Sequence, residues 1–210
     1  MKELKEKYRR RVENLTLAAS LQKRRLQLSS ISRIAVFVII GLTGYWVLQG
    51  EQLYLVAVFL LIVLFAYLVS RHEDLKYEAR RLRELIELNR TELRVLEGDF
   101  SGLPDGVSLQ TPNHAFSEDL DLFGPRSFFQ YLNRTGLSSG AKTLAEWLSS
   151  NQTRGIPEKQ EAVQELASQM EWRQQFTATA RMIETPLSAG ELTAWMDSYQ
   201  PRIPQWAAHL

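Results

Sequence analysis

The segment IAVFVIIGLTGYWVLQG-E-QLYLVAVFLLIVLFAYLVS, residues 34–70, contains a single charged residue, Glu51, near its middle. The stretches on either side, 34–50 and 52–70, are uncharged and rich in Val, Ile, Leu and Phe. At a helical rise of about 1.5 Å per residue, each stretch extends roughly 26–28 Å, close to the thickness of the hydrocarbon region of a bilayer. One helix of the whole length would overshoot the membrane even if tilted. The sequence therefore predicts a transmembrane helical hairpin that turns at Gly50-Glu51-Gln52.

The charges around this hairpin are distributed asymmetrically, although the net charge of the chain is only +1. Residues 1–33 hold ten Lys or Arg against three Asp or Glu, whereas residues 99–210 hold eight against thirteen. Basic residues flank both outer ends of the hairpin, and Tyr45 and Trp46 lie near its turn. These patterns predict two spans in the inner (plasma) membrane with both termini cytoplasmic. The alternative is a buried hairpin in a soluble helical protein, but such helices normally keep a polar face.

The basic arm, residues 1–33, has three candidate roles. Its runs Arg9-Arg10-Arg11 and Lys23-Arg24-Arg25 could attract anionic lipid headgroups, at roughly 1 kcal/mol for each residue near the surface. They could instead contact nucleic-acid phosphates or set the topology of the hairpin. Lipid attraction and topology are favoured, because the arm leads directly into the membrane and has no aromatic residue between its basic runs.

Helical patterns extend from both outer ends of the hairpin. The basic helix 1–33 carries an apolar stripe, made of Leu17, Leu21, Leu28 and Ile31. Residues 71–97 carry a heptad seam, made of Leu75, Ala79, Leu82, Ile86, Asn89, Leu93 and Leu96. These patterns predict two long helices packed antiparallel as a coiled-coil stalk, and the 75–96 seam also permits self-association with a second chain. Asn89 either selects the register or oligomeric state of the seam, or faces solvent.

The remainder of the chain reads as a linker, 98–112, followed by a mostly helical unit, 113–210. The glycines and prolines of 98–112 break any helix, so this segment is a linker or the turn-rich beginning of the next unit. Helices are expected at 126–132, 140–148, 158–170 and 192–199, the last with the capping-box pair Ser188 and Glu191. A short extended segment is expected at Leu120–Leu122. The predicted fold class is therefore mainly α, and the apolar end at Trp206–Leu210 suggests a portion of a longer protein.

Motifs that carry chemistry are scarce. The chain has no cysteine, which excludes disulfides, thiolate metal sites and a cysteine nucleophile. Its three histidines lie far apart, and no phosphate loop, dinucleotide fingerprint, nucleophile elbow or zincin motif occurs. The acidic residues Glu118, Asp119 and Asp121 favour a solvated face over a hard-cation site, because further oxygen ligands are not evident. The sequence predicts no catalytic, cofactor-binding or metal-binding residue, no small-molecule substrate and no enzymatic activity of this chain.

Four motifs follow one another from His114 onward. They are HAFSEDLDLFG (114–124), SFFQYLNRT (127–135), GAKTLAEWL (140–148) and KQEAVQEL (159–166). Together, over about 113–182, they resemble the start of the core, or lever, domain of the MutS family of DNA mismatch repair ATPases. A membrane-attached branch of that family also begins with an apolar hairpin. The resemblance implies a membrane-anchored MutS-like portion whose globular part is the base of the lever domain, a mechanical element without catalysis.

The family's nucleotide site and mismatch-reading domain have no counterpart in this chain. Phe116-Ser-Glu118 matches the mismatch-reading Phe-x-Glu by letters only, because it lies inside the core-domain run, so Phe116 and Phe123 are expected in the core. ATP and Mg²⁺ are expected only if an ATPase domain follows, and DNA only through parts outside this chain. The acidic excess after Asp99 agrees with that expectation.

A further expectation concerns the core of the globular part. Helical spacing predicts a packed core formed by two sets of residues, Phe128, Tyr131 and Leu132, and Leu144, Trp147 and Leu148.

The function has an alternative from another class. In this alternative the chain is a non-enzymatic membrane scaffold whose cytosolic helical domain binds a protein partner.

Overall fold

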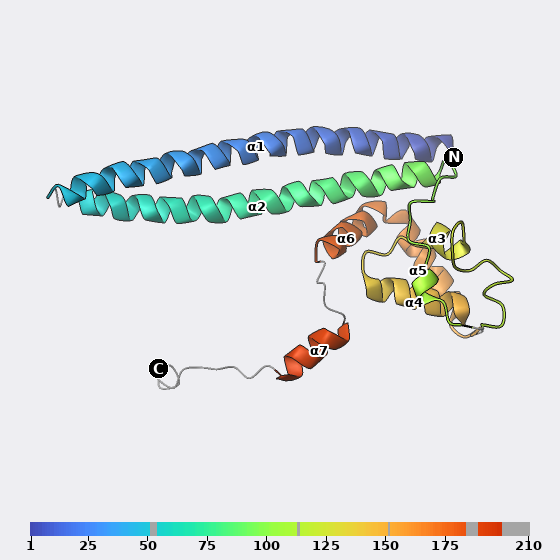
Figure 1. Cartoon of the computed structure of the whole chain (residues 1–210). Helices are drawn as coiled ribbons and strands as arrows, with labels where there is room; N and C mark the ends of the chain where they lie inside the picture. The colour runs from blue at the N-terminus through green and yellow to red at the C-terminus, as the bar shows by residue number, and fades with distance from the viewer. Residues whose placement is uncertain (51–53, 113, 151, 184–188, 199–210) are drawn as a thin grey trace.

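A computed structural model describes the chain except for residues 51–53, 113, 151, 184–188 and 199–210. Two long helices dominate it, α1 (Lys2–Leu48) and α2 (Tyr54–Val95), which lie side by side and antiparallel (Figure 1). The smaller elements are η1 (Val107–Leu109), α3 (Phe128–Leu132), α4 (Ser138–Ser149), α5 (Ile156–Ser168), α6 (Met170–Met182) and α7 (Ala189–Ser198). Every regular element in the described residues is helical, which confirms the mainly α fold class.

The break between the two long helices falls at the predicted position. The first helix ends at Leu48 and the second begins at Tyr54. Gly50 has a φ of 99°, a conformation that glycine adopts without the steric penalty of a side chain and that commonly ends a helix. Glu51 and Gln52, the other two residues of the predicted turn, lie outside the described residues.

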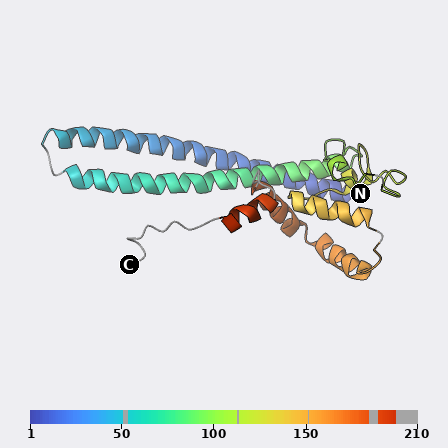
Figure 2. The ribbon, with the colours of Figure 1, turned by 60° about the horizontal axis from the view of Figure 1, so that its bottom comes forward.

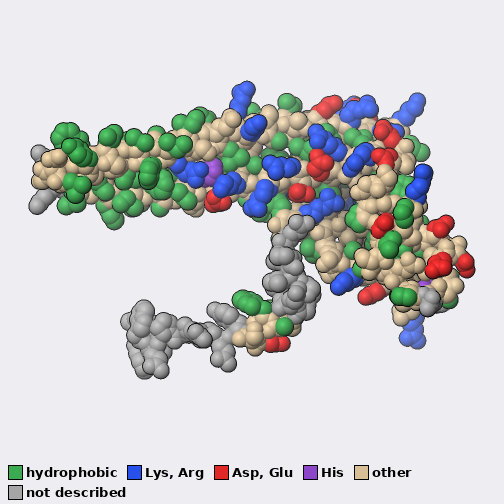
Figure 3. Space-filling model, viewed as in Figure 1, with side chains coloured by type: hydrophobic (Ala, Val, Ile, Leu, Met, Phe, Trp, Pro, Cys, Tyr) green, Lys and Arg blue, Asp and Glu red, His purple; other side chains and the backbone are tan. Residues whose placement is uncertain are grey.

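Both long helices contain a segment that is long and apolar enough to span a membrane. Their 18-residue windows have mean hydropathies of 1.9 and 2.3, and 6% and 0% of these windows is buried inside the protein. A core helix of a soluble protein would bury most of such a surface. Figure 3 shows apolar side chains covering the half of the hairpin near its turn, while charged side chains cover the other half. The exposed apolar half is what a lipid-facing hairpin requires.

The 75–96 seam of α2 packs against α1 in the same chain. All seven of its members are buried or half-buried, including Asn89. The register is marked by Lys5 and Glu97, whose Nζ and Oε1 atoms are 3.5 Å apart, and by Gln22, whose Nε2 donates to the Leu75 carbonyl at 3.1 Å. Self-association through this seam stays a prediction, although the seam already has a partner in α1.

The apolar stripe expected on α1 is not the face that contacts α2. Leu17, Leu21, Leu28 and Ile31 are all more than half exposed. The face toward α2 repeats every seven residues and is made of Tyr8, Leu15, Gln22 and Ser29, all buried or half-buried. Two of these residues are polar and find hydrogen-bond partners on α2. Hydrophobicity alone therefore selected the wrong face of α1.

Helices α3, α4, α5 and α6 gather toward the end of the stalk farthest from the hairpin turn (Figures 1 and 2), whereas α7 lies apart from them in Figure 1. Of these helices, α6 packs along α2, whereas α5 has no buried residue and projects away from the stalk in Figure 2. The helix expected at 158–170 ends at Ser168, and Gln169, with φ −95° and ψ 51°, separates it from α6. The last expected helix is present as α7, while Ser188 and Tyr199 lie outside the described residues.

Two expectations about the globular part are wrong. Residues 115–121 form turns and not an extended segment, and Asp121 has a φ of 47°. Phe128, Tyr131 and Leu132 are each at least 39% exposed, whereas Phe129 between them is fully buried. The reason is that the preceding chain passes over the ring of Phe129 at Gly106, which leaves the face with Phe128, Tyr131 and Leu132 on the outside.

The second expected core set is partly wrong. In α4, Ala145 is buried and Leu144 and Leu148 are half-buried, but Trp147 is exposed. Its ring lies under the ammonium group of Lys159 from α5, with the Nζ atom 4.3 Å from the ring centroid. Trp147 is therefore an outer contact between two helices and not a core residue.

Candidate functional site at the stalk junction

The globular part meets the stalk where α6 packs against α1 and α2; we call this contact the stalk junction. The inward face of α6 consists of Met170, Gln174 and Ala178, spaced by four residues, as one side of a helix requires. Ala178 is fully buried against Leu85 and Leu88 of α2, with Leu15 of α1 at the edge. A small residue at position 178 allows the backbone of α6 to approach the stalk closely.

A buried pair of amide side chains lies at the centre of the stalk junction. The Nε2 of Gln174 donates to the Oδ1 of Asn89 at 2.9 Å, and the Nδ2 of Asn89 donates to the Oε1 of Gln174 at 3.1 Å. The same Nδ2 donates to the Leu85 carbonyl at 2.7 Å, and the Nε of Arg11 donates to Oε1 of Gln174 at 3.2 Å. Asn89 is fully buried, so it does not face solvent; within this chain it receives α6, and a role in oligomeric state stays a prediction.

Charged contacts flank the amide pair on both sides. Arg81 of α2 donates through Nε and Nη2 to Oε1 of Gln175 at 2.9 and 2.6 Å. On the other side, Nε of Arg134 lies 2.7 Å from Oε1 of Glu92. Burial, and then the nearby Glu92 carboxylate, raises the pKa of Tyr8, so this hydroxyl stays protonated and can donate. The hydrogen bonds to Gln174 and Gln175 can form in only one orientation of α6, so together they fix how this helix docks on the stalk.

The segment before α4 also lies tightly against α6. A Cβ atom added at Gly136 would lie 2.9 Å from Cβ of Ala180 and 3.1 Å from the carbonyl oxygen of Thr177. Only a residue without a side chain fits there unless α6 moves. The connection between α3 and α4 is thus packed against Thr177 and Ala180 of α6, beside the face that contacts the stalk.

Residues 98–127 contact α3 at several points, among them the ring of Phe129 and the amide of Gln130. A Cβ at Gly106, whose φ is 74°, would lie 2.5 Å from the ring of Phe129, so the chain passes directly over this ring. The Nε2 of Gln130 donates to the carbonyls of Ser101 and Leu103, at 3.2 and 2.6 Å. The segment 98–112 is therefore the turn-rich beginning of the globular unit and not a free linker.

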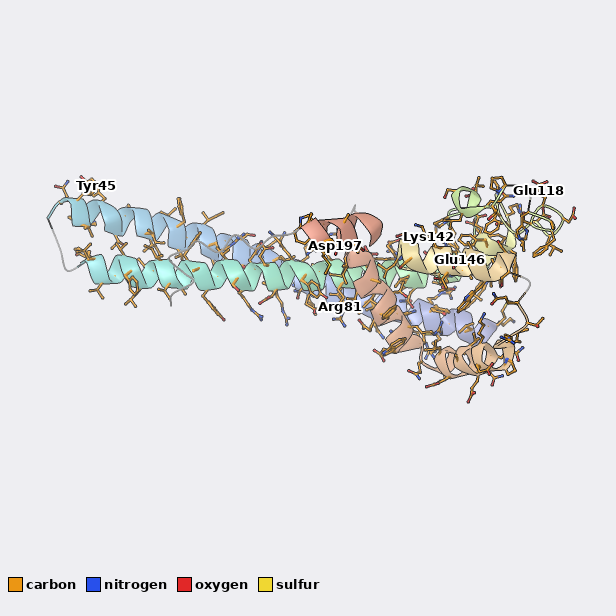
Figure 4. The ribbon with its side chains drawn as sticks, turned by 90° about the horizontal axis from the view of Figure 1, so that it is seen from below. Tyr45, Arg81, Glu118, Lys142, Glu146 and Asp197 are labelled. Carbon is orange, nitrogen blue, oxygen red and sulfur yellow. The ribbon has the colours of Figure 1, made fainter. Side chains whose placement is uncertain are left out.

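A cavity of about 470 Å³ lies beside α4, lined among others by His114, Lys142, Glu146 and Ser149. The Nε2 of His114 lies 2.9 Å from the backbone carbonyl of Ser149, so the imidazole does not activate the serine hydroxyl. Lys142 and Glu146 come from successive turns of α4 and are both exposed (Figure 4). This arrangement provides polar lining but no nucleophile paired with a base.

The acidic residues singled out in the sequence lie in the turns before α3. Glu118, Asp119 and Asp121 are all exposed, and Figure 4 shows Glu118 at the outer end of the globular part. Within the described residues, no group of three or more His, Asp or Glu side chains is arranged to hold a metal ion.

The basic run Arg9-Arg10-Arg11 of α1 lies partly on the exposed surface and partly at the stalk junction. Arg9 and Arg10 are exposed and pair with Glu6, at 3.8 and 2.9 Å, while Arg11 reaches Gln174 at the stalk junction. Exposed pairs of this kind contribute little to stability. The sequence analysis missed that Arg11 and Gln174 form part of the stalk junction. One signal was available: Gln174 lies between Met170 and Ala178 on an otherwise apolar face of the helix, which indicates a buried polar contact.

No family model matches the chain, and neither the curated proteins nor the solved structures contain a match to it.

Proposed function

We propose that the chain is a membrane tether that holds a small helical domain at a fixed place on a rigid stalk. The observation that carries this proposal is a contrast between the two halves of the hairpin. Around Leu85–Asn89, α6 packs on α2 and forms hydrogen bonds with it, whereas the apolar windows of the two long helices are hardly buried by the protein. At about 1.5 Å per residue, 15 to 19 residues separate the end of the apolar segment from this contact, roughly 20–30 Å. The domain is held close to the membrane without lying on it.

The proposed orientation puts both termini in the cytoplasm and the hairpin turn on the other side of the inner membrane. Arg33 and Arg71 bound the apolar segment at its two outer ends, and Glu51 is the one charge within it. This distribution supports the orientation through the positive-inside rule. The rigid pairing of α1 and α2 supports it as well, since both helices must then leave the membrane on the same side.

The MutS resemblance extends the proposal to the protein of which this chain would be the N-terminal portion. In that protein, the tether and the base of the lever domain would serve an ATP-dependent, DNA-binding machine of the mismatch repair type. The chain itself would bind neither ATP nor DNA and would catalyse nothing. This extension is supported by one feature of the fold. The segment that resembles the MutS family, about 113–182, is helical and is joined to the stalk through α6, as an element that transmits force would need to be.

The alternative, a scaffold that binds a protein partner, is favoured by the outer face of α6. Trp172 and Phe176 are both more than half exposed, and their rings are stacked with centroids 5.4 Å apart and planes inclined by 12°. Val163 of α5 is exposed as well. Apolar faces of this kind mark surfaces that another protein segment covers, either in the same polypeptide or in a partner.

Single cysteines test the tether, because the natural chain has none. Gln49→Cys places a thiol beside the hairpin turn, and Lys142→Cys places one on exposed α4. In intact cells, a membrane-impermeant maleimide should label position 49, and it should label position 142 only after lysis. Labelling of 142 but not 49 in intact cells would reverse the orientation, and extraction of the chain by alkaline carbonate would refute membrane insertion.

Two further observations separate the MutS proposal from the scaffold. An in-frame ATPase with Walker A and B motifs downstream of Leu210 supports the first, and a stop codon with no ATPase nearby supports the second. ATP hydrolysis by the purified 210-residue chain would contradict the non-enzymatic role that both proposals share.

A further inference from the structure

The boundary between the apolar half of the hairpin and the stalk carries an unusual cationic group. Arg33 of α1 and His72 of α2 lie here, on the faces that the two helices turn toward each other. The Oγ of Ser29 lies 3.1 Å from Nδ1 of His72, whose side chain is only 5% exposed. One turn further toward the membrane, the rings of Phe37 and Phe65 have centroids 6.3 Å apart. Figure 3 shows a histidine and several Lys or Arg side chains gathered at this level.

The guanidinium of Arg33 has no acidic partner among the described residues. Its Nε atom is buried between the helices without a hydrogen-bond partner, and no carboxylate of the described chain lies within 4.0 Å of the group. The nearby Glu73 is already occupied, because its Oε1 lies 2.7 Å from Nζ of Lys76. The side chain of Arg33 is therefore held in place by protein but not neutralised by it.

An unpaired arginine at the edge of the hydrocarbon region is costly, and such groups acquire partners. The guanidinium is planar and offers N–H donors in a fork that matches the oxygens of a phosphate. The phosphodiesters of membrane lipids lie at the depth where a span ends. Arg71 adds positive charge at the same end of the apolar segment, which favours a lipid whose headgroup is anionic.

The distance along α1 distinguishes Arg33 from the rest of the basic arm. At about 1.5 Å per residue, Arg24 lies roughly 14 Å and Arg10 roughly 35 Å along the helix from Arg33. The Debye length at physiological salt is about 8 Å, so the attraction of these outer charges to the lipid surface is strongly screened. Arg24 is also fully on the exposed side of the helix, without an enclosed nitrogen.

We propose that Arg33, at the contact between α1 and α2 beside His72, binds the phosphate of one anionic phospholipid at the cytoplasmic edge of the bilayer. The site rests on the proposed function, because it exists only when the hairpin is inserted. This site would change the role of the basic arm. Arg33 alone recognises the lipid, and the arginines farther along the arm, such as Arg24 and Arg10, serve other contacts.

The test is native mass spectrometry of the full chain in non-ionic detergent, titrated with phosphatidylglycerol, phosphatidylcholine or water-soluble glycerol phosphate. Arg33→Gln should weaken binding of the first phosphatidylglycerol roughly ten- to a hundredfold, as expected for loss of a charged hydrogen-bonded contact. The matched Arg24→Gln variant should stay within about twofold of the natural chain. Arg33→Lys, which keeps the charge but loses the planar fork, should lie between them.

Equal losses in Arg33→Gln and Arg24→Gln would overturn the proposal in favour of diffuse charge attraction. Glycerol phosphate that competes at the same concentration as the lipid would overturn the lipid as the source of the phosphate. Circular dichroism of each variant checks that the helices persist, and Arg33→Lys tests the site even if Arg33→Gln fails to fold. If carbonate extraction releases the natural chain, the tether itself fails; if the chain stays inserted but shows no lipid preference, only this site fails.

Discussion

Gln174→Ala is the substitution that most directly tests the stalk junction. It removes three hydrogen bonds that end on the amide of Gln174, two with Asn89 and one with Arg11. Asn89 is fully buried, so its Oδ1 loses its partner without access to water. A net hydrogen bond is worth about 0.5–1.5 kcal/mol, and a buried polar group left without a partner costs about 1–3 kcal/mol. The expected loss in the free energy of docking α6 is therefore about 2–4 kcal/mol.

The assay is amide hydrogen exchange of α6 in the detergent-solubilised chain. If α6 exchanges by leaving the stalk, 2–4 kcal/mol corresponds to a roughly 30- to 1000-fold faster exchange, because each 1.4 kcal/mol is a factor of ten. The matched control is Gln175→Ala, the adjacent residue, which loses its bonds with Arg81 at a partly exposed position. It should cost about 1 kcal/mol or less, because solvent replaces part of what is lost.

The double variant Asn89→Leu with Gln174→Leu separates polar specificity from stability. Replacing both amides by apolar groups of similar size leaves no unpaired amide at position 89 or 174, and only the partly buried Arg11 loses an acceptor, so most of the lost protection should return. Equal exchange in the Gln174→Ala and Gln175→Ala variants would refute the central role of the amide pair. A double variant less protected than Gln174→Ala would refute the explanation from an unsatisfied buried group.

Three further predictions concern the stalk and its contacts with the globular part. Gly136→Ala should destabilise the chain by about 1–3 kcal/mol through overpacking against α6, measurable as a lower urea midpoint; an unchanged midpoint would contradict the close approach. Glu92→Gln, which removes the partner of Arg134, should cost about 1 kcal/mol, and 1 M salt should reduce that difference, because the pair is partly exposed. Burial, and then the charge of Arg33, lowers the pKa of His72, so its contribution to stability is present above pH 6.5 and is lost as the pH falls below that value. His72→Asn should flatten this thermal-stability profile between pH 7.5 and 5, and an unaltered profile would refute the assignment.

Local patterns were sufficient to predict the long elements of this protein. The apolar segment 34–70 with one central charge predicts two spans and their break, since no single helix of that length fits a bilayer. The 75–96 heptads predict the face of α2 that packs on α1, because seven members in register leave little choice of face. The position of α5 follows from Pro157 near its start, where the missing N–H is harmless.

The packing of short or polar elements was not predictable in the same way. The single-turn α3 turns Phe129 inward and Phe128 outward, and only the loop that crosses at Gly106 decides between them. On α1, the face with more leucines lies outside, because Gln22 and Ser29 obtain hydrogen bonds from α2 that hydrophobicity does not register.

The long helical hairpin, with its apolar half and its charged half, could be read from the sequence, because charge and hydrophobic periodicity are local properties. The surroundings of Asn89 and Arg33 could not, because they depend on how the helices pack. Asn89 is separated from Gln174 by 85 residues, so no local spacing connects the two amides that lock α6 to the stalk. Arg33 differs from the other arginines of the arm because the approach of α2 encloses its Nε atom, and enclosure is a property of the packed pair of helices alone.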